Sequence, residues 1–427
     1  MVMRNLKHMN MIAGLDIGNG YVKGSTSVNG KEKTTIDFMS SVAIQTNGHD
    51  VKTREEDAEM LIKDIFNEME AAFDSPIIDS NFHRLFGRRG VSSARSVKEF
   101  DVSSTMSKAD DELSSVLVCG CLAGKALQAY FKETGELPKD TIYVNVDVLT
   151  LALPITEYKA KRKGYAQKFK EGTHLVSIYN FERPIRVELN IESVEVVAEG
   201  ASAQYAIAAY GIPLMEALLA DLEQQGEKLE GIKAEHVLAA ENTVGIDIGE
   251  GTVNFPVYQN GRFNPDVSMS FPKGYGTVLE QARERLEKIS MPFQSRKSLA
   301  DFLMRKPSPL QEPRYNRVMD VVREECMGFA HEVGQEFLKV MSRVGSYTEV
   351  VFVYGGGSGP LKQFLHPELI NLSKHFGGED VSYPILYLNA MYSRTLNREG
   401  LFIIAKTLND ARIADAKAKA KAEAQKK

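Results

Sequence analysis

The chain has 427 residues, 43 % of them apolar and 26 % charged, with a formal net charge of −5. Because this length exceeds what one hydrophobic core usually serves, the sequence predicts two or more domains of ordinary globular composition. The mild charge gives no electrostatic basis for direct binding of nucleic acid or an anionic membrane, and the lack of a long apolar run or a signal-peptide centre predicts a cytoplasmic protein.

The first predicted element is a strand, a tight turn and a returning strand near the N-terminus. A short apolar run leads into Asp16-Ile17-Gly18-Asn19-Gly20, and a strand pattern resumes from Tyr21 to Val28 before the type I′ hairpin signal Asn29-Gly30. Glycines let backbone N–H groups approach an anion, and an aspartate beside them can hold a divalent cation against phosphate oxygens. The turn therefore predicts a phosphate site, with Lys23 on the return strand within reach of β- or γ-phosphate.

The segment that follows mixes helical and strand patterns. Amphipathic spacing predicts helices at 55–73 and 110–134, and alternating or apolar runs predict strands at 141–153, 174–179 and 185–197. The basic stretch 159–170 is predicted to be a loop or a hairpin edge.

Two motifs inside 110–134 invite functional interpretations that their residues do not support. Gly120 to Lys125 mimics a P-loop, but it is one residue short and Ala126 stands where Ser or Thr is required. Cys119 and Cys121 have a metal-ligand spacing, but no second Cys/His pair lies nearby. Together with Cys326 they are expected to be buried in helices.

Glu199 stands where the last of these strands gives way to a helix that runs to Tyr210, and a further helix is predicted at 213–225. A carboxylate at such a junction can project into a cleft, which makes Glu199 a candidate functional residue. The alternative, a helix-start carboxylate favoured by the helix dipole, stays equally open from the local pattern.

The strand–turn–strand pattern recurs in the second half of the chain. An apolar run ends in Asp247-Ile248-Gly249-Glu250-Gly251-Thr252, a strand follows to Tyr258, and Asn260-Gly261 repeats the hairpin signal. Each copy alone is also typical of an ordinary glycine hairpin. Their duplication favours two related half-domains that bind one nucleotide.

A third glycine-rich loop follows predicted helices at 278–289 and 317–344 and a predicted strand at 349–354. Gly355-Gly356-Gly357-Ser358 connects that strand to a helix beginning near Leu361. Bare glycine backbone lets a flat ligand lie against the chain. Because two phosphate turns precede it, this loop is predicted to be an adenosine shelf.

In this order, the two turns, Glu199 and the glycine loop resemble the phosphate loops, connecting segment and adenosine loop of the actin fold. Three further segments are similar to ones typical of the plasmid-segregating bacterial actins of the ParM/StbA type: Leu153 to Tyr158, Gly345 to Gly357 and Leu388 to Tyr392. The resemblance spans about residues 11–405. It implies an α/β, actin-like fold with two related domains, each a mixed β-sheet flanked by helices, and a nucleotide in the cleft between them.

The resemblance also implies domain bounds. Domain I is expected at 1–198 with a subdomain IB at about 39–110, and domain II at 199–388 with a subdomain IIB at about 274–345. Residues 389–427 are expected to return to domain I and to end in an Ala/Lys-rich, solvated helical tail. A lysine-rich arm that contacts a neighbouring subunit or DNA is the alternative for this tail.

Carried over to this chain, the resemblance implies a Mg²⁺-dependent ATPase, with ATP expected and GTP as the alternative. Asp16 and Asp247 would organise the metal and its waters, and Glu199 would orient the attacking water, with Glu199 and Asp247 as the catalytic residues. The implied nucleotide-binding residues are Asp16, Gly18, Asn19, Gly20, Tyr21, Lys23, Gly249, Glu250, Gly251, Thr252, Gly355, Gly356, Gly357 and Ser358. Two positions depart from the family pattern, since Asn254 replaces an aspartate and Glu250 a glycine, which leaves the hydrolysis rate and metal geometry open.

The function implied by the resemblance is a homopolymeric filament that segregates plasmid DNA. It would polymerise between plasmid copies bound by a ParR-like DNA-binding adaptor at a centromere-like site, so neither direct nucleic-acid binding nor membrane contact is expected. Two other classes remain as alternatives, a small-molecule kinase of the same superfold and a non-polymerising, chaperone-like ATPase. The kinase needs a substrate-side aspartate, and none stands beside Glu199; the chaperone needs a long substrate-binding extension, for which the tail is too short.

Overall fold

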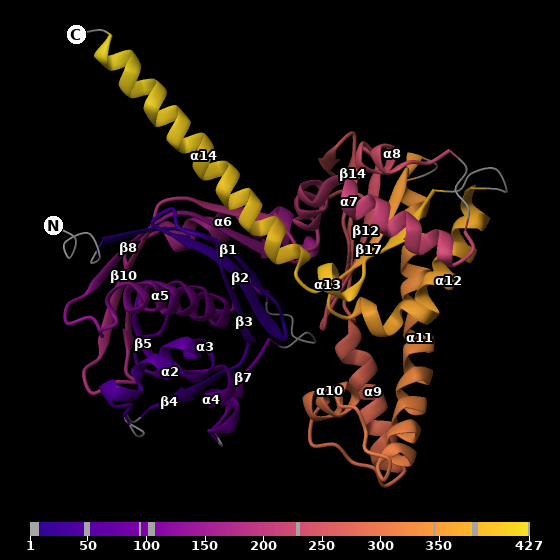
Figure 1. Ribbon diagram of the computed structural model, residues 1–427, viewed down its shortest axis with the longest axis horizontal. Coiled ribbons are helices and arrows are strands. Elements are labelled where there is room, and N and C mark those ends of the chain that lie inside the picture. Colours follow the sequence, from indigo (N-terminus) through magenta and orange to yellow (C-terminus); the bar gives the residue numbers. More distant parts are fainter. Residues whose placement is uncertain are drawn as a thin grey trace. The chain divides into compact units, whose positions relative to one another are not determined.

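The computed structural model describes residues 8–46, 52–93, 95–100, 107–227, 231–344, 347–377 and 383–425 (Figure 1). The chain forms two compact units. Unit 1 contains residues 1–206 and 397–427, and unit 2 contains residues 207–396. In sequence, unit 2 is therefore an insertion into unit 1, whereas the predicted domain bounds lie at 198/199 and 388/389.

Unit 1 is built on a mixed β-sheet. Among its described residues, eleven strands take the order β3-β2-β1-β8-β10-β9-β5-β6-β4-β7, with β11 paired to β8. Their bounds are β1 His8–Ile17, β2 Tyr21–Val28, β3 Thr34–Met39, β4 Val42–Gln45, β5 Glu70–Asp74, β6 His83–Phe86, β7 Val97–Lys98, β8 Ile142–Leu153, β9 His174–Ile178, β10 Ile185–Ile191 and β11 Val194–Ala198. Strand β1 runs antiparallel to β2 and parallel to β8. The first glycine turn, Gly18 to Gly20, therefore begins at the end of an inner strand of this sheet.

Helix α5 (Glu112–Thr134) is the core helix of unit 1. The Asp111 side chain caps its start by accepting a hydrogen bond from Leu113 N, and Gly135 ends it with a left-handed φ of 68°. The other helical elements are η1 Glu55–Asp57, α2 Ala58–Lys63, α3 Ile65–Glu68, α4 Gly87–Ser92 and α6 Ile155–Lys170. Because Gly120 to Lys125 lie within α5, the exclusion of a P-loop is confirmed. The three cysteines are buried in α5 and α11, as predicted.

Two secondary-structure predictions for unit 1 are wrong. The predicted helix at 55–73 ends at Glu68, and Glu70–Asp74 instead form β5, in which Ala71 and Phe73 alternate into the core. The basic stretch 159–170 is helical, not a loop. Only Ile155, Tyr165 and Phe169 of α6 are buried, so the apolar pattern of this helix is weak.

Unit 2 contains a second mixed sheet. In the described part of this unit the order is β15-β14-β12-β13-β16, and β17 pairs with both β12 and β18. The strands are β12 Thr243–Ile248, β13 Val253–Phe255, β14 Val257–Gln259, β15 Arg262–Phe263, β16 Met269–Phe271, β17 Val350–Tyr354 and β18 Ile385–Tyr387. The helices are α8 Ala234–Leu238, α9 Tyr275–Lys288, α10 Arg296–Met304, α11 Glu312–Val344, α12 Ser358–Gly377 and α13 Ala390–Ser393. The sequence predicts α9, α11 and α12 but not α10.

Both Asn-Gly hairpin predictions are confirmed by the backbone. Asn29 and Gly30 have φ values of 52° and 68°, and Asn260 and Gly261 have values of 50° and 68°. Two successive residues with positive φ are the requirement of a type I′ turn. The same hairpin therefore follows the glycine turn in each unit.

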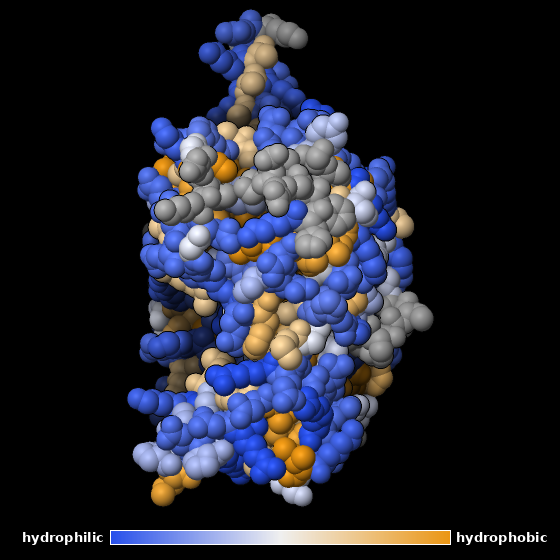
Figure 2. Space-filling model, turned by 90° about the vertical axis from the view of Figure 1, so that its right-hand side faces the viewer, coloured by the Kyte–Doolittle hydropathy of each residue, from blue (hydrophilic) through white to orange (hydrophobic). Residues whose placement is uncertain are grey.

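Two helices, α5 and α7 (Ala203–Gln224), are long and apolar enough by composition to cross a membrane, contrary to the expectation that no run approaches this length. The relevant window of α5 is 83 % buried within the protein, as in the core helix of a globular domain. Helix α7 is interrupted at Gly211, where φ and ψ are 62° and −149°. The face drawn in Figure 2 is largely hydrophilic, with apolar side chains in small separate groups, as is ordinary for a surface in contact with water.

Helix α14 (Leu396–Ala424, yellow in Figure 1) carries the chain back into unit 1. Its backbone lies so close to neighbouring segments that a Cβ on Gly400 would be 1.8 Å from Ser202 O, and one on Gly14 of β1 would be 2.5 Å from Phe402 N. Further along, the Arg412 guanidinium donates to Asp147 O and Glu192. Residues 410–423 of this helix are all exposed.

Candidate functional site

The first glycine turn closes the β1–β2 hairpin in unit 1. Asp16 pairs with Lys23 in the register, and Gly18 N donates to Tyr21 O at 3.0 Å. Ser40, which directly follows β3 and which the sequence does not single out, fastens the turn, because its N–H donates to Gly20 O at 3.0 Å and its hydroxyl to Gly18 O at 2.6 Å. The turn is thus a fixed backbone feature with its carbonyl groups already engaged.

Asp16 belongs to a compact group of charges in unit 1. Burial raises the pKa of its carboxyl group, Lys23 and Lys108 oppose that shift, and Glu199 adds to it. The Lys108 ammonium donates to Glu199 Oε1 at 2.5 Å, and the two side chains are only 5 % and 15 % exposed. The structure therefore brings three predicted residues, Asp16, Lys23 and Glu199, into one electrostatic environment.

Lys108 is a functional candidate that sequence reasoning missed. It lies just before α5, 91 residues from Glu199, and no motif surrounds it. Glu157 of α6 fixes this segment, since its carboxylate accepts from Lys108 N at 3.0 Å and from Ala109 N at 3.2 Å. The only signal in the sequence is indirect: Glu157 lies in the ParM-like segment Leu153 to Tyr158.

The second glycine turn joins β12 to β13 in unit 2 and repeats the geometry of the first. Asp247 pairs with Asn254, and Gly249 N donates to Thr252 O at 2.9 Å. The start of α9 supports this turn, because Tyr275 N donates to Gly249 O at 3.0 Å and the next amide donates to Glu250 O at 2.8 Å. Asp247 is only 5 % exposed, so its carboxylate is held in a largely desolvated position.

Asn254, one of the two departures from the family pattern, is satisfied as a neutral amide. Its side chain is 3 % exposed. Its Nδ2 donates to Thr252 Oγ1 at 3.3 Å, and its Oδ1 accepts from Ser270 Oγ at 2.6 Å. The amide thereby links the second turn to β16 without adding a second negative charge beside Asp247.

The third loop lies against the second turn within unit 2. Gly357 N donates to Ile248 O at 2.8 Å. Gly355 has a φ of 100°, and a Cβ there would be 2.4 Å from Ile248 O, so only glycine fits. Gly356 is exposed, whereas Ser358 is fully buried and its hydroxyl contacts Gly355 O and Ser393 Oγ, both at 2.8 Å. The Ser358 side chain thus supports the loop from behind.

A cavity of about 860 Å³ adjoins this loop. Gly356 and Gly359 line it together with Tyr275, and helices α10 and α11 contribute apolar side chains such as Leu303 and Val322. Its size is in the range of small-molecule sites, and an apolar wall beside bare backbone suits a planar base. The cavity is formed entirely by residues of unit 2.

The residues present fit a Mg²⁺–nucleotide complex. The described residues contain no group of three or more His, Cys, Asp or Glu side chains that would hold a metal alone. Mg²⁺ in nucleotide sites typically takes one or two carboxylates, several waters and phosphate oxygens. Each unit by itself offers one carboxylate of this kind beside a glycine turn, Asp16 in unit 1 and Asp247 in unit 2.

Comparison with known proteins agrees with this architecture. Residues 14–201 match the family described as actin like proteins N terminal domain. Among solved structures, apo psk41 ParM is 18 % identical, with 95 % of this chain and 99 % of that chain covered and a TM-score of 0.53. The actin-like protein Alp7A is 15 % identical, with 96 % and 99 % covered and a TM-score of 0.63. Bacillus thuringiensis ParM with ATP is 15 % identical, with 94 % and 99 % covered and a TM-score of 0.57.

No curated protein matches the sequence. The family match covers most of unit 1 up to residue 201, and the structural matches extend the similarity through unit 2. The chain thus has the actin-like fold that the sequence predicts, and its residues 14–201 match the model of actin-like protein N-terminal domains.

Proposed function

We propose that this protein is a Mg²⁺-dependent ATPase that assembles into filaments and segregates plasmid DNA in the cytoplasm. The observation that carries the proposal is the same aspartate–glycine turn in both units, each fastened by hydrogen bonds from neighbouring backbone. Solved structures of Bacillus thuringiensis ParM with ATP, ADP and AMPPNP support it, since they are similar to this chain over 94 % of its length.

In this proposal each turn donates backbone N–H groups to the nucleotide phosphates, and Lys23 adds a positive charge. Asp16 and Asp247 would hold Mg²⁺ through water, and the ion would supply positive charge that stabilises the charge developing on the phosphates. Glu199 orients the attacking water, and Lys108 fixes the Glu199 carboxylate through the 2.5 Å hydrogen bond. The cavity beside Gly356 receives the base.

Phosphate release tests the hydrolytic part. Glu199→Ala is expected to retain the affinity for a fluorescent ATP analogue and to release phosphate at least about 100-fold more slowly, because a positioned general base typically contributes 10²–10⁴-fold. Asp247→Ala is expected to abolish the dependence of the rate on Mg²⁺. Exposed Glu171 provides the matched control, as Glu171→Ala should leave both quantities unchanged. Normal turnover by Glu199→Ala would remove the water-positioning role from this residue.

Right-angle light scattering tests filament formation. Scattering is expected to rise after ATP and Mg²⁺ are added and to fall as phosphate is released, because hydrolysis removes the γ-phosphate contacts that favour the assembling shape. Glu199→Ala should give filaments that persist. Phosphate release with flat scattering at all protein concentrations would instead favour a kinase or a chaperone-like ATPase.

The plasmid role requires a partner that recognises DNA. We propose a small DNA-binding adaptor that binds the filament ends and a centromere-like plasmid site. Co-sedimentation of labelled plasmid with filaments, with and without the protein encoded beside this one, measures this step. Sedimentation of plasmid without any adaptor would contradict it.

A further inference from the structure

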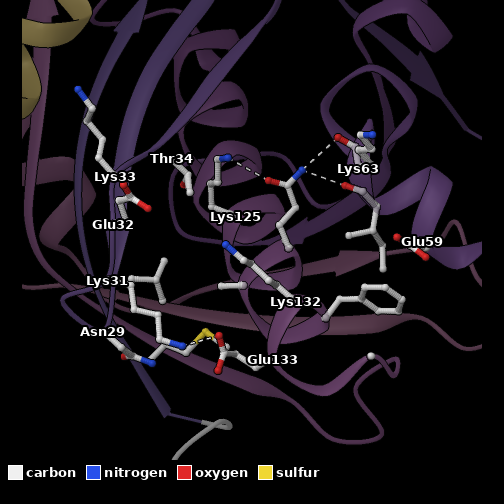
Figure 3. A pocket seen from close by; sticks show the side chains of 17 residues that line it. Asn29, Lys31, Glu32, Lys33, Thr34, Glu59, Lys63, Lys125, Lys132 and Glu133 are labelled. Carbon is white, nitrogen blue, oxygen red and sulfur yellow. Dashed lines mark hydrogen bonds and ion pairs between the residues drawn. The ribbon is translucent and has the colours of Figure 1, made fainter.

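A second cavity, of about 810 Å³, lies in unit 1 (Figure 3), and neither the glycine turn nor Glu199 is among the residues that line it. The β2–β3 hairpin, α2 and the C-terminal half of α5 surround it. Its lining includes five lysines, Lys31, Lys33, Lys63, Lys125 and Lys132, and three glutamates, Glu32, Glu59 and Glu133. Nothing in the proposed ATPase activity uses these residues.

Lys125 is the central feature of this cavity. It is only 6 % exposed, and its ammonium donates to Gln128 Oε1 at 3.0 Å and lies 5.5 Å from the centre of the Phe66 ring. Among the described residues no carboxylate is within ion-pair distance of it. Burial without a counter-charge lowers the pKa of this amine to about 8. The protein therefore maintains a costly buried cation at the wall of a cavity.

Gln128 shows that this arrangement is built and not accidental. Its Nε2 donates to Ile62 O at 2.9 Å and to Lys63 O at 3.3 Å, so the amide oxygen is turned towards Lys125 (Figure 3). The side chain thus ties α2 to α5 and fixes the ammonium group at the cavity wall.

The other lysines divide into neutralised and available ones. Lys31 pairs with Glu133, and Lys33 pairs with Glu399 at 2.5 Å and points away from the other labelled lysines in Figure 3. Lys63 and Lys132 have no carboxylate partner within the described part of the chain. The cationic side of the cavity is therefore formed by Lys125 together with the ends of α2 and α5.

The remaining lining includes the polar residues Asn29 and Thr34, and one side of the cavity is apolar. Met9 of β1 and Ile62 of α2 are almost completely buried, and Val28, Ala129 and Phe131 complete this side. A bare inorganic anion would leave this surface in contact with water, whereas a neutral apolar molecule would leave Lys125 without a counter-ion. The lining thus places one buried cation beside an apolar wall.

We infer that this cavity binds a small amphiphilic anion, a molecule with an apolar body and one carboxylate or phosphate group that pairs with Lys125. The oxyanion supplies the counter-charge that the protein lacks at this position, and the apolar body displaces water from the half-buried Val28, Ala129 and Phe131. The volume is in the range that holds a drug-sized ligand. This site is independent of nucleotide binding.

Isothermal titration calorimetry with octanoate and octyl phosphate tests the inference on the full-length protein. At least one of these two amphiphiles is expected to bind at one site per chain, and the tighter of the two identifies the preferred oxyanion. Neutral octanol and inorganic phosphate should bind at least tenfold more weakly. Lys125→Met should weaken binding of the anions at least tenfold and leave octanol unchanged. Exposed Lys163 of α6 is the matched control, since Lys163→Met should change neither.

A second variant addresses the cavity and not the charge. Ala129→Phe retains Lys125 and fills the chamber, so it should abolish binding of octanoate while ATP-dependent phosphate release continues. Four results would each overturn the inference. Two concern the ligands: octanol binds as tightly as octanoate, or inorganic phosphate binds as tightly as octyl phosphate. The other two are an unchanged affinity for octanoate in Lys125→Met and no binding of either amphiphile.

Discussion

The Lys108–Glu199 pair offers a quantitative test of how the candidate catalytic carboxylate is held. Lys108→Met leaves Glu199 without its cation, and Glu199→Gln leaves Lys108 without its carboxylate. The pair is 5 % and 15 % exposed, so solvent does little to compensate for the lost partner. Removing one member of a buried ion pair costs about 3–5 kcal/mol of stability, whereas replacing both members with uncharged groups changes the stability much less.

The magnitudes follow from these exposures. Each single variant is expected to lose about 3 kcal/mol of local stability, at the lower end of the range because both side chains retain some contact with solvent. If the two losses were additive, the double variant would lose about 6 kcal/mol. We expect it to lose roughly 3 kcal/mol or less, and the difference is a coupling free energy of about 3 kcal/mol or more. The Asp16 carboxyl group reports the same coupling, because its pKa should rise in Lys108→Met and fall in Glu199→Gln.

Hydrogen exchange of the β1 amides measures local stability in unit 1 without assuming that both units unfold together. Carboxyl NMR signals give the pKa of Asp16 in each variant. Additive losses in the double variant, or an Asp16 pKa that responds to neither substitution, would refute the view that these groups form one electrostatic unit.

Three further predictions concern other parts of the chain. The pKa of Lys125 lies at about 8, below its ordinary value of 10.5. Below pH 8 the buried side chain is charged, and the folded state bears the full cost of that buried charge. Above about pH 10.5 the amine is neutral in both the folded and the unfolded chain, and the cost disappears. Lys125→Met should therefore raise the free energy of unfolding by up to about 3 kcal/mol at pH 7 and by almost nothing at pH 10.5, and urea titrations showing the same gain at both would disprove this. Gly355→Ala should destabilise unit 2 by about 2 kcal/mol or more and weaken ATP binding, because its φ of 100° and the 2.4 Å approach to Ile248 O exclude a side chain. Gly359, with open space around it, is the control, and an equal loss in Gly359→Ala by thermal unfolding would contradict the steric argument. Arg412→Ala should speed amide exchange of residues 411–424 of α14 and leave 398–406 unchanged; faster exchange along the whole helix would show that Arg412 is not a local anchor.

The glycine turns were predictable because their information is local. Gly18 and Gly249 each follow an apolar strand and precede a returning one, and both Asn-Gly hairpins adopt the backbone their residues require. The sequence therefore predicts the two-unit architecture and the place of each turn. Ser358 was also placed correctly at the loop, although its buried hydroxyl contacts Ser393.

The incorrect predictions for α6 and for residues 70–74, and the omission of Lys108, are cases in which tertiary contacts determine the structure. Helix α6 has only Ile155, Tyr165 and Phe169 buried, so its lysine-rich pattern resembles a solvated loop until those residues meet the sheet. Residues 70–74 continue an apparent helical pattern but join β6 and β9 as an inner strand. Lys108 and Glu199 are 91 residues apart in the sequence, so no local spacing of residues predicts that they form an ion pair.

The insertion of unit 2 into unit 1 has a consequence for biosynthesis. Chain elongation proceeds from the N-terminus, so β1 and β8 are made long before α14, whose backbone packs against Gly14 and Ser202. All 190 residues of unit 2, from 207 to 396, must leave the ribosome in between. A nascent unit 1 therefore waits with one side of β1 uncovered, exposed to chaperones or to misassembly, until the last 31 residues, from 397 to 427, are released.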